Sequence, residues 1–280
     1  MRTKEPGAAG DGVGRGEQGG HWISSTTGEP AHRAHTTGSL LMLDDMRVLR
    51  DAVEEYRAAA TAAGITWPER GESPGAQPPD LVYRLFDVDH VAEQLTWLQS
   101  QAWPEPAFPE GGYLVPWPTD GGEALDNLSL SIGTPFPWRH QLTLLHFDVL
   151  FYTFVLAGDH EGEIWRYEIS PDAWDAVRAA DSLAALFTEW TKGMAAGVVR
   201  PTDISGDRWL LVGGDGRDTF EVLQEHGLDP FAFPVAPLEE TLLRARQREC
   251  GVDMTCIARG FDCHEELLDA IDATRASLGM

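Results

Sequence analysis

The chain has 280 residues, enough for one large domain or two small ones at about 150 residues per domain. Apolar residues make up 42% and charged residues 24%, which excludes a wholly disordered or fibrous chain. Its 45 acidic and 21 basic residues give a formal net charge of −24. An acidic surface repels phosphate, so the charge argues against nucleic acid or an anionic membrane as partners. It favours attraction of a basic protein, or equally a surface that only confers solubility.

The negative charge lies in the parts of the chain that are expected to fold. Residues 1–38 carry no net charge, residues 39–200 carry −15 and residues 201–280 carry −9. No apolar run is long enough to predict a membrane span, and the N-terminus lacks the apolar stretch of a signal peptide. Three cysteines are too few, and odd in number, for a disulfide framework. We therefore expect a cytoplasmic protein.

The N-terminal third predicts a tail followed by helices. Residues 1–38 are rich in Gly, Ser, Thr and Pro and are predicted to be disordered. Apolar side chains then recur at steps of three and four from residue 42 to residue 63, which predicts a helix that ends at Gly64. After a Pro- and Gly-rich loop, residues 81–86 predict a strand. A second helix is expected from about Asp87 to Ala102.

The middle of the chain predicts a meander of antiparallel strands. A segment rich in Pro, Gly and aromatic residues after Trp103 is typical of a loop that leads into an edge strand. The expected strands are residues 128–132, two segments within 142–156, and residues 163–169. Helices are expected from Ser170 and Ser182, because serine is a good helix cap. Residues 39–200 are therefore predicted to form an α+β domain, an antiparallel sheet flanked by helices.

Residues 201–280 predict alternating strands and helices. The expected strands are residues 209–213, 231–235 and 252–258, and the expected helices begin near Asp218, Pro237 and Asp262. Asp218 with Glu221, and Asp262 with Glu265, have the spacing of capping boxes. This order predicts a small β-α-β-α-β-α appendage, as a parallel sheet or as an extension of the first sheet.

Three groups of residues are candidate sites of chemistry. The turn from Gly213 to Gly216 lacks the glycine spacing and the lysine of a phosphate-binding loop. The cysteines are too widely spaced for a structural zinc site and are expected to be small buried side chains, so no metal or other cofactor is expected. His146 and Asp148 would share a strand face, as a base and its orienting carboxylate do, but no nucleophile motif accompanies them.

The tryptophans give a stronger indication of binding. Eight of the ten lie between residues 39 and 200. Trp117 and Trp138 stand in Pro-rich, turn-like surroundings, where exposed aromatic side chains beside acids are typical of protein-binding surfaces. Coverage of a sheet edge is an equally good interpretation of both.

The central segment resembles the SUKH superfamily, over about residues 85–197. An aromatic, Pro- and Gly-rich segment leads into an acidic turn, and a late strand precedes a closing helix. The matching residues are Gly122, Glu123 and Leu125 in the turn and Ser182, Leu183, Leu186, Phe187 and Trp190 in the helix. The family's usual helix start is absent, since Pro79–Asp80 matches it poorly, and residues 201–280 lie outside the match. The resemblance implies a non-catalytic α+β domain that binds another protein, in many bacterial members a toxin.

We therefore expect a disordered tail (1–38), a SUKH-like domain (39–200) and an appendage (201–280). The expected function is non-catalytic binding of a basic protein, such as a nuclease toxin that this chain would neutralise as an immunity protein. The candidate binding residues are Trp117, Asp120, Glu123, Trp138 and Glu161. Two alternatives remain open: an enzyme with a site around His146 and Asp148 or the turn at Gly213–Gly216, and a scaffolding module.

Overall fold

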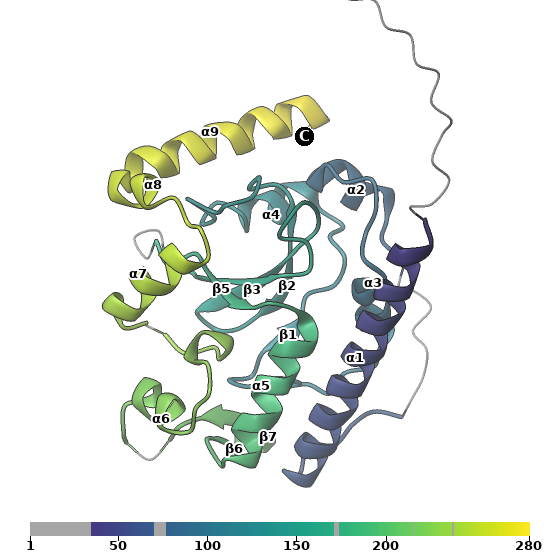
Figure 1. The fold of residues 1–280 in the computed structure, drawn as a ribbon, viewed down its shortest axis with the longest axis vertical. Helices are drawn as coiled ribbons and strands as arrows, with labels where there is room; N and C mark the ends of the chain where they lie inside the picture. The colour runs from purple at the N-terminus through teal and green to yellow at the C-terminus, as the bar shows by residue number, and fades with distance from the viewer. Residues whose placement is uncertain (1–34, 70–76, 171–173, 215, 237) are drawn as a thin grey trace, which may run out of the picture. The chain divides into compact units, whose positions relative to one another are not determined.

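A computed structural model describes residues 35–69, 77–170, 174–214, 216–236 and 238–280 (Figure 1). The chain divides into two units, Met1–Leu40 and Leu41–Met280, and the second contains the sheets and the buried core. The disorder predicted for residues 1–38 falls almost entirely outside the described residues. None of the helices in the described ranges combines the length and the apolarity needed to cross a bilayer.

Helices and antiparallel strands fall largely into separate runs along the chain, which confirms the predicted α+β class. The helices are α1 (His35–Ala62), α2 (Asp80–Phe86), α3 (Glu93–Ser100), α4 (Gly121–Asp126), α5 (Leu183–Ala195), α6 (Thr219–Glu225), α7 (Glu240–Glu249), α8 (Met254–Arg259) and α9 (Phe261–Leu278), with a 3₁₀ turn, η1 (Pro230–Ala232). The strands are β1 (Tyr113–Leu114), β2 (Gln141–His146), β3 (Leu150–Val155), β4 (Ile164–Glu168), β5 (Val177–Ala180), β6 (Val199–Ile204) and β7 (Asp207–Val212).

Strands β1 to β5 form one antiparallel sheet in chain order, which is the predicted meander. Its last strand occupies a place where a helix was expected: residues 177–180 pair with β4 and alternate between buried and half-buried positions. The helix predicted from Ser170 is therefore wrong over these residues, and residues 171–173 lie outside the described part. The helix predicted from Ser182 is confirmed as α5, whose first turn is capped by the Ser182 hydroxyl.

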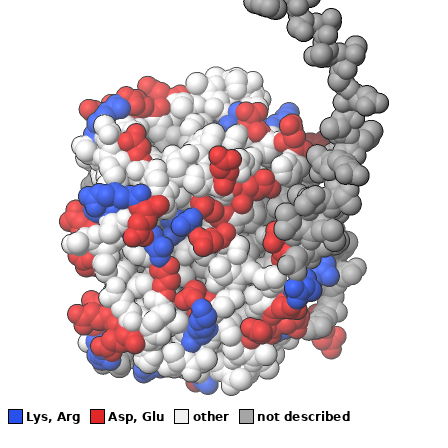
Figure 2. Space-filling model, viewed as in Figure 1, with Lys and Arg blue, Asp and Glu red and all other residues white. Residues whose placement is uncertain are grey.

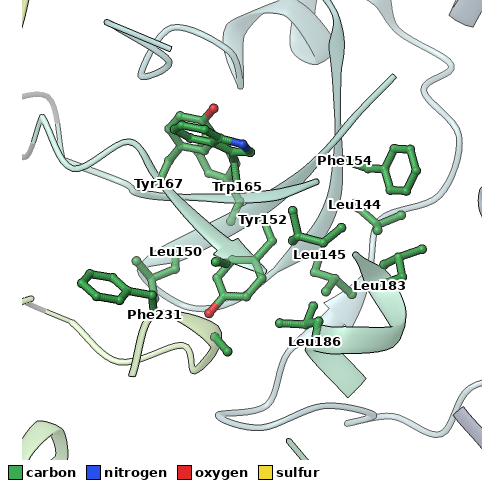
Figure 3. Close-up of a cluster of buried hydrophobic side chains, with 14 of the residues drawn as sticks. Leu144, Leu145, Leu150, Tyr152, Phe154, Trp165, Tyr167, Leu183, Leu186 and Phe231 are labelled. Carbon is green, nitrogen blue, oxygen red and sulfur yellow. The ribbon is translucent and has the colours of Figure 1, made fainter. Parts of the chain in front are cut away.

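Helices cover both sides of this sheet, and Figure 1 shows α4 and α5 on opposite sides of it. In Figure 3, Leu144 and Leu145 of β2 lie beside Leu183 and Leu186 of α5, while Trp165 and Tyr167 lie on the other side of the strands. A bulge in β2 between Thr143 and Leu145 changes the register at this point. An aromatic cluster joins α1 to α5, formed by Tyr56, Trp103, Phe108, Phe187 and Trp190.

Two predicted strands before the sheet are wrong. Residues 80–86 form α2, because Val82, Leu85 and Phe86 are buried at steps of three and one, which is a helical spacing. Residues 128–132 form turns, in which the buried Ser131 hydroxyl donates to the Leu128 carbonyl oxygen. The apolar residues that alternate in this segment therefore pack into the protein without forming a strand.

The C-terminal region contains no parallel sheet among its described residues, so the predicted β-α-β-α-β-α order is wrong. The strand expected at 209–213 is β7, but it pairs antiparallel with β6. Residues 231–235 begin in η1, and residues 252–258 are mostly the helix α8, which Asp253 caps. Asp218 caps α6, since its carboxylate accepts from the Glu221 N–H at 3.0 Å, whereas the last helix begins at Phe261, before the expected cap at Asp262.

Residues on both sides of position 200 pack into one core. The boundary expected there falls inside β6, and buried side chains from both regions form one cluster. The fully buried Arg166 guanidinium donates to the carbonyl oxygens of Phe233 and Val235, at 2.9 and 2.8 Å. The Trp190 indole N–H donates to the Ala232 carbonyl oxygen at 2.8 Å. These bonds fix the C-terminal region against the sheet.

Candidate protein-binding surface

A cleft opens where the edge strand β1 separates from β2. Val115 makes the last backbone bond between them, from its N–H to the Leu144 carbonyl oxygen at 2.9 Å. The prolines at 116 and 118 have no N–H with which to continue the ladder. The space has a volume of about 230 Å³, and we call it the tryptophan cleft. It is lined by Phe86, Tyr113, Val115, Pro116, Trp117, Pro118, Thr119, Asp120, Glu123, Ala124, Asn127, Leu142 and Thr143.

Helix α4 supplies the acidic rim of this cleft. The Asp120 carboxylate caps the helix by accepting from the Gly122 N–H at 2.8 Å. Glu123 lies in the first turn, where a negative charge is stabilised by the helix dipole. Both side chains are exposed. Local capping therefore places two carboxylates at one end of a short helix, beside the aromatic wall.

Helix α9 packs against α4. Arg275 of α9 forms an ion pair with Asp126 and also donates to the Gly122 carbonyl oxygen. A side chain at Gly121 would overlap Met280 and Leu85, so the glycine permits this close approach. The rim of the cleft is thus supported by a segment more than a hundred residues away in the sequence.

Thr143 of β2 lines the cleft and is only 6% exposed. Its hydroxyl is buried and has no hydrogen-bond partner among the described residues. Thr153 lies directly opposite on β3, and its hydroxyl donates to the Gln141 amide oxygen at 2.8 Å. Because buried hydroxyls are normally paired, the unpaired one at the cleft stands out.

A second hollow of about 710 Å³ lies between α1, the segment before α3, and α5. We call it the acidic groove. It is lined by Asp45, Met46, Val48, His90, Val91, Ala92, Glu93, Gln94, Phe154, Glu161, Gly162, Asp181, Ser182 and Ala184. The His90 imidazole Nε2 lies 3.0 Å from the Glu161 carboxylate. Apolar side chains form much of its lining, and four carboxylates accompany them.

The cleft and the groove adjoin at one corner of the sheet. Leu142 of the cleft pairs with Phe154 of the groove in the β2–β3 register, and the chain from Phe86 to His90 borders both. Among the described residues that line them are six carboxylates and neither Lys nor Arg. Figure 2 shows a face on which Asp and Glu outnumber Lys and Arg. Arg178, which lies outside both linings, pairs with Asp181 at 3.2 Å, so the corner takes its negative charge from the other five carboxylates, beside aromatic and apolar surface.

Four of the five candidate residues line one or the other of these hollows, whose linings have no residue in common. Trp117, Asp120 and Glu123 line the tryptophan cleft, and Glu161 lines the acidic groove. The exposed ring expected at Trp117 is wrong, because this side chain is only 9% exposed and belongs to the core. Trp138 lines neither hollow; it is half-buried, and its carbonyl oxygen accepts from the Gln141 side chain at 2.9 Å. No sequence pattern singles out Thr143, or the groove acids Asp45, Glu93 and Asp181, because only the fold places them together.

Of the residues of the enzyme alternative, His146 and Asp148 have different surroundings. The His146 ring packs against the Tyr113 ring, with centroids 5.3 Å apart. Asp148 is exposed and lines a separate pocket of about 260 Å³ with Glu110. Burial raises the pKa of Glu110, whose carboxylate accepts from a backbone N–H. Gly213 and Gly216 have positive φ, as a tight turn requires.

The expectation for the cysteines is wrong for two of them. Cys256 of α8 and Cys263 of α9 form a disulfide, with Cα atoms 5.6 Å apart, whereas Cys250 is a buried free thiol. The intervening helix end brings the two sulfurs together, where a strand over residues 252–258 would have separated them. The described residues contain no group of three or more side chains suited to holding a metal ion.

Comparisons of the chain with protein-family models, with curated proteins and with solved structures found no match.

Proposed function

We propose that this chain is a non-catalytic binding protein whose partner is a basic protein. The observation that carries the proposal is the corner formed by the tryptophan cleft and the acidic groove, with its six carboxylates and no Lys or Arg among the described lining residues. A chain of net charge −24 attracts a basic protein over long distances, and this corner supplies the local complement.

The kind of partner follows from the resemblance to the SUKH superfamily and from the charge. A nuclease grips phosphates with a basic face, so an acidic protein can cover that face and block the substrate. We therefore propose an immunity protein that neutralises a basic toxin. The aromatic and apolar side chains of the corner supply the desolvated contacts from which such interfaces gain affinity.

Affinity capture from the source cells tests this proposal. The full chain is compared with a variant that carries Glu93→Gln in the groove and Glu123→Gln at the cleft. The control carries Glu249→Gln and Asp269→Asn, two exposed acids that line neither hollow. A basic protein should bind the natural chain and the control alike, and the first variant at least tenfold more weakly at low salt.

The captured protein must also be a toxin. Its expression alone should arrest growth, and coexpression of this chain should restore growth. Capture of no stoichiometric partner, capture of an acidic one, or equal binding by the corner variant and the control would overturn the proposal.

A further inference from the structure

We propose that the tryptophan cleft is a receptor for a single arginine side chain of the partner. This inference rests on the proposed function, since it names the side chain by which the basic partner would be anchored. The cleft's volume of about 230 Å³ lies below the roughly 300–1,000 Å³ of sites for drug-sized ligands. Its scale is that of one long side chain.

The polar groups of the cleft fit a cation with several donors. The Thr143 hydroxyl is unpaired and buried at the lining, so it can accept a hydrogen bond from an N–H group once the side chains that cover it move aside. The carboxylates of Asp120 and Glu123 stand at the rim and carry the opposite charge. A group that donates in more than one direction can bond the Thr143 hydroxyl and a rim carboxylate at once. Guanidinium is such a group, because it has five N–H donors in a plane.

The apolar part of the lining favours guanidinium over ammonium. Pro116, Trp117 and Pro118 belong to the lining, where Trp117 is largely buried, and the exposed aromatic ring is that of Tyr113, at 47%. Guanidinium is weakly hydrated and stacks on aromatic rings, whereas the ammonium of lysine is a strongly hydrated point charge. Arginine is also enriched among the residues that dominate binding energy at protein interfaces.

The free protein supports the assignment through its unmet hydrogen bond. A hydroxyl buried without a partner destabilises the fold, and Thr153 shows that the same residue on the neighbouring strand is paired. An incoming N–H donor would supply the bond that Thr143 lacks. The bound state thus completes a site that the free protein leaves incomplete.

A titration with small probes tests the site without the partner. N-acetyl-L-arginine amide is added to the ¹⁵N-labelled full chain at about 150 mM salt, which screens loose attraction between exposed charges. N-acetyl-L-citrulline amide, which has the same shape and no charge, and N-acetyl-L-lysine amide are the matched probes. The arginine probe should shift the amide resonances of Tyr113, Val115 and Thr143, and citrulline and lysine should bind at least tenfold and threefold more weakly.

Variants then assign the contacts. Thr143→Val and Glu123→Gln should each weaken the arginine probe at least fivefold, while Glu249→Gln, at an exposed acid that lines neither hollow, should leave it unchanged. Thr143→Val must have a melting temperature no lower than that of the natural chain, so that lost binding is not lost folding. Equal binding of citrulline, lysine binding as tight as arginine, shifts centred on the acidic groove, or unchanged affinity in Thr143→Val would overturn the inference.

The two proposals fail in different ways. Capture of a basic toxin together with no response to the arginine probe would overturn the arginine site alone. A specific arginine response in a chain that captures no basic protein would overturn the proposed function and leave the site standing.

Discussion

Replacing Thr143 by valine should stabilise the protein. The hydroxyl is buried without a partner, and such burial costs roughly 1–3 kcal/mol in protein mutational data. Valine has nearly the same shape and removes the hydroxyl without leaving a cavity. We expect the free energy of unfolding to rise by about 1–2 kcal/mol, which corresponds to a melting temperature about 2–6 °C higher in a unit of this size.

Thr153→Val is the matched control, because it is the same change at the residue directly opposite. Its hydroxyl donates to Gln141, whose amide oxygen also accepts from the Tyr167 hydroxyl at 2.6 Å. The amide oxygen keeps one partner after the substitution, so the loss should be about 1 kcal/mol. Urea unfolding followed by circular dichroism measures both variants. Equal destabilisation by the two substitutions would refute the reasoning, since it would mean that Thr143 has a hydrogen-bond partner in solution.

Three further predictions concern the core and the disulfide. Tyr56→Phe should lower the free energy of unfolding by about 1–2 kcal/mol in the same assay, because the buried hydroxyl donates to a backbone carbonyl oxygen at 2.8 Å. Alkylation of the unfolded chain should modify one cysteine without reductant and three after reduction, and loss of the Cys256–Cys263 bond should cost about 2 kcal/mol. Burial raises the pKa of Asp175, so the folded state keeps that proton to higher pH than the unfolded state. Stability should therefore fall as pH rises from about 4, the ordinary pKa of aspartate, through the raised value. Urea midpoints against pH should fall less steeply in Asp175→Asn, and an unchanged slope would contradict the assignment.

The sequence predicted the elements whose neighbours are local. The strands within residues 142–156 are long apolar runs joined by a short connection, and α5 carries its own cap at Ser182. Residues 81–86 and 252–258 have equally apolar composition, but they are too short for periodicity to distinguish a helix from a strand. The structure shows both as helices: the buried positions of α2 have helical spacing, and Asp253 accepts from the N–H groups at the start of α8.

The candidate site could be predicted only in part for the same reason. Trp117, Asp120 and Glu123 lie within seven residues of one another, so composition alone draws attention to them. Thr143 is a single polar residue in the apolar run Leu142–Leu145, and nothing local shows that its hydroxyl lacks a partner. The groove acids come from four separate segments that only the folded chain brings together.

The tryptophan cleft exists because β1 is too short to cover β2. If the strand continued past Val115, its backbone would pair with β2 and fill the space above Thr143. The prolines at 116 and 118 prevent this, and they direct the chain away to start α4 with its two acids. The same feature that opens the cleft thus costs the sheet part of an edge strand and leaves a threonine unpaired. Natural proteins commonly accept such losses of stability where binding requires them. Stabilisation by Thr143→Val together with loss of arginine binding would show that trade-off at a single hydroxyl group.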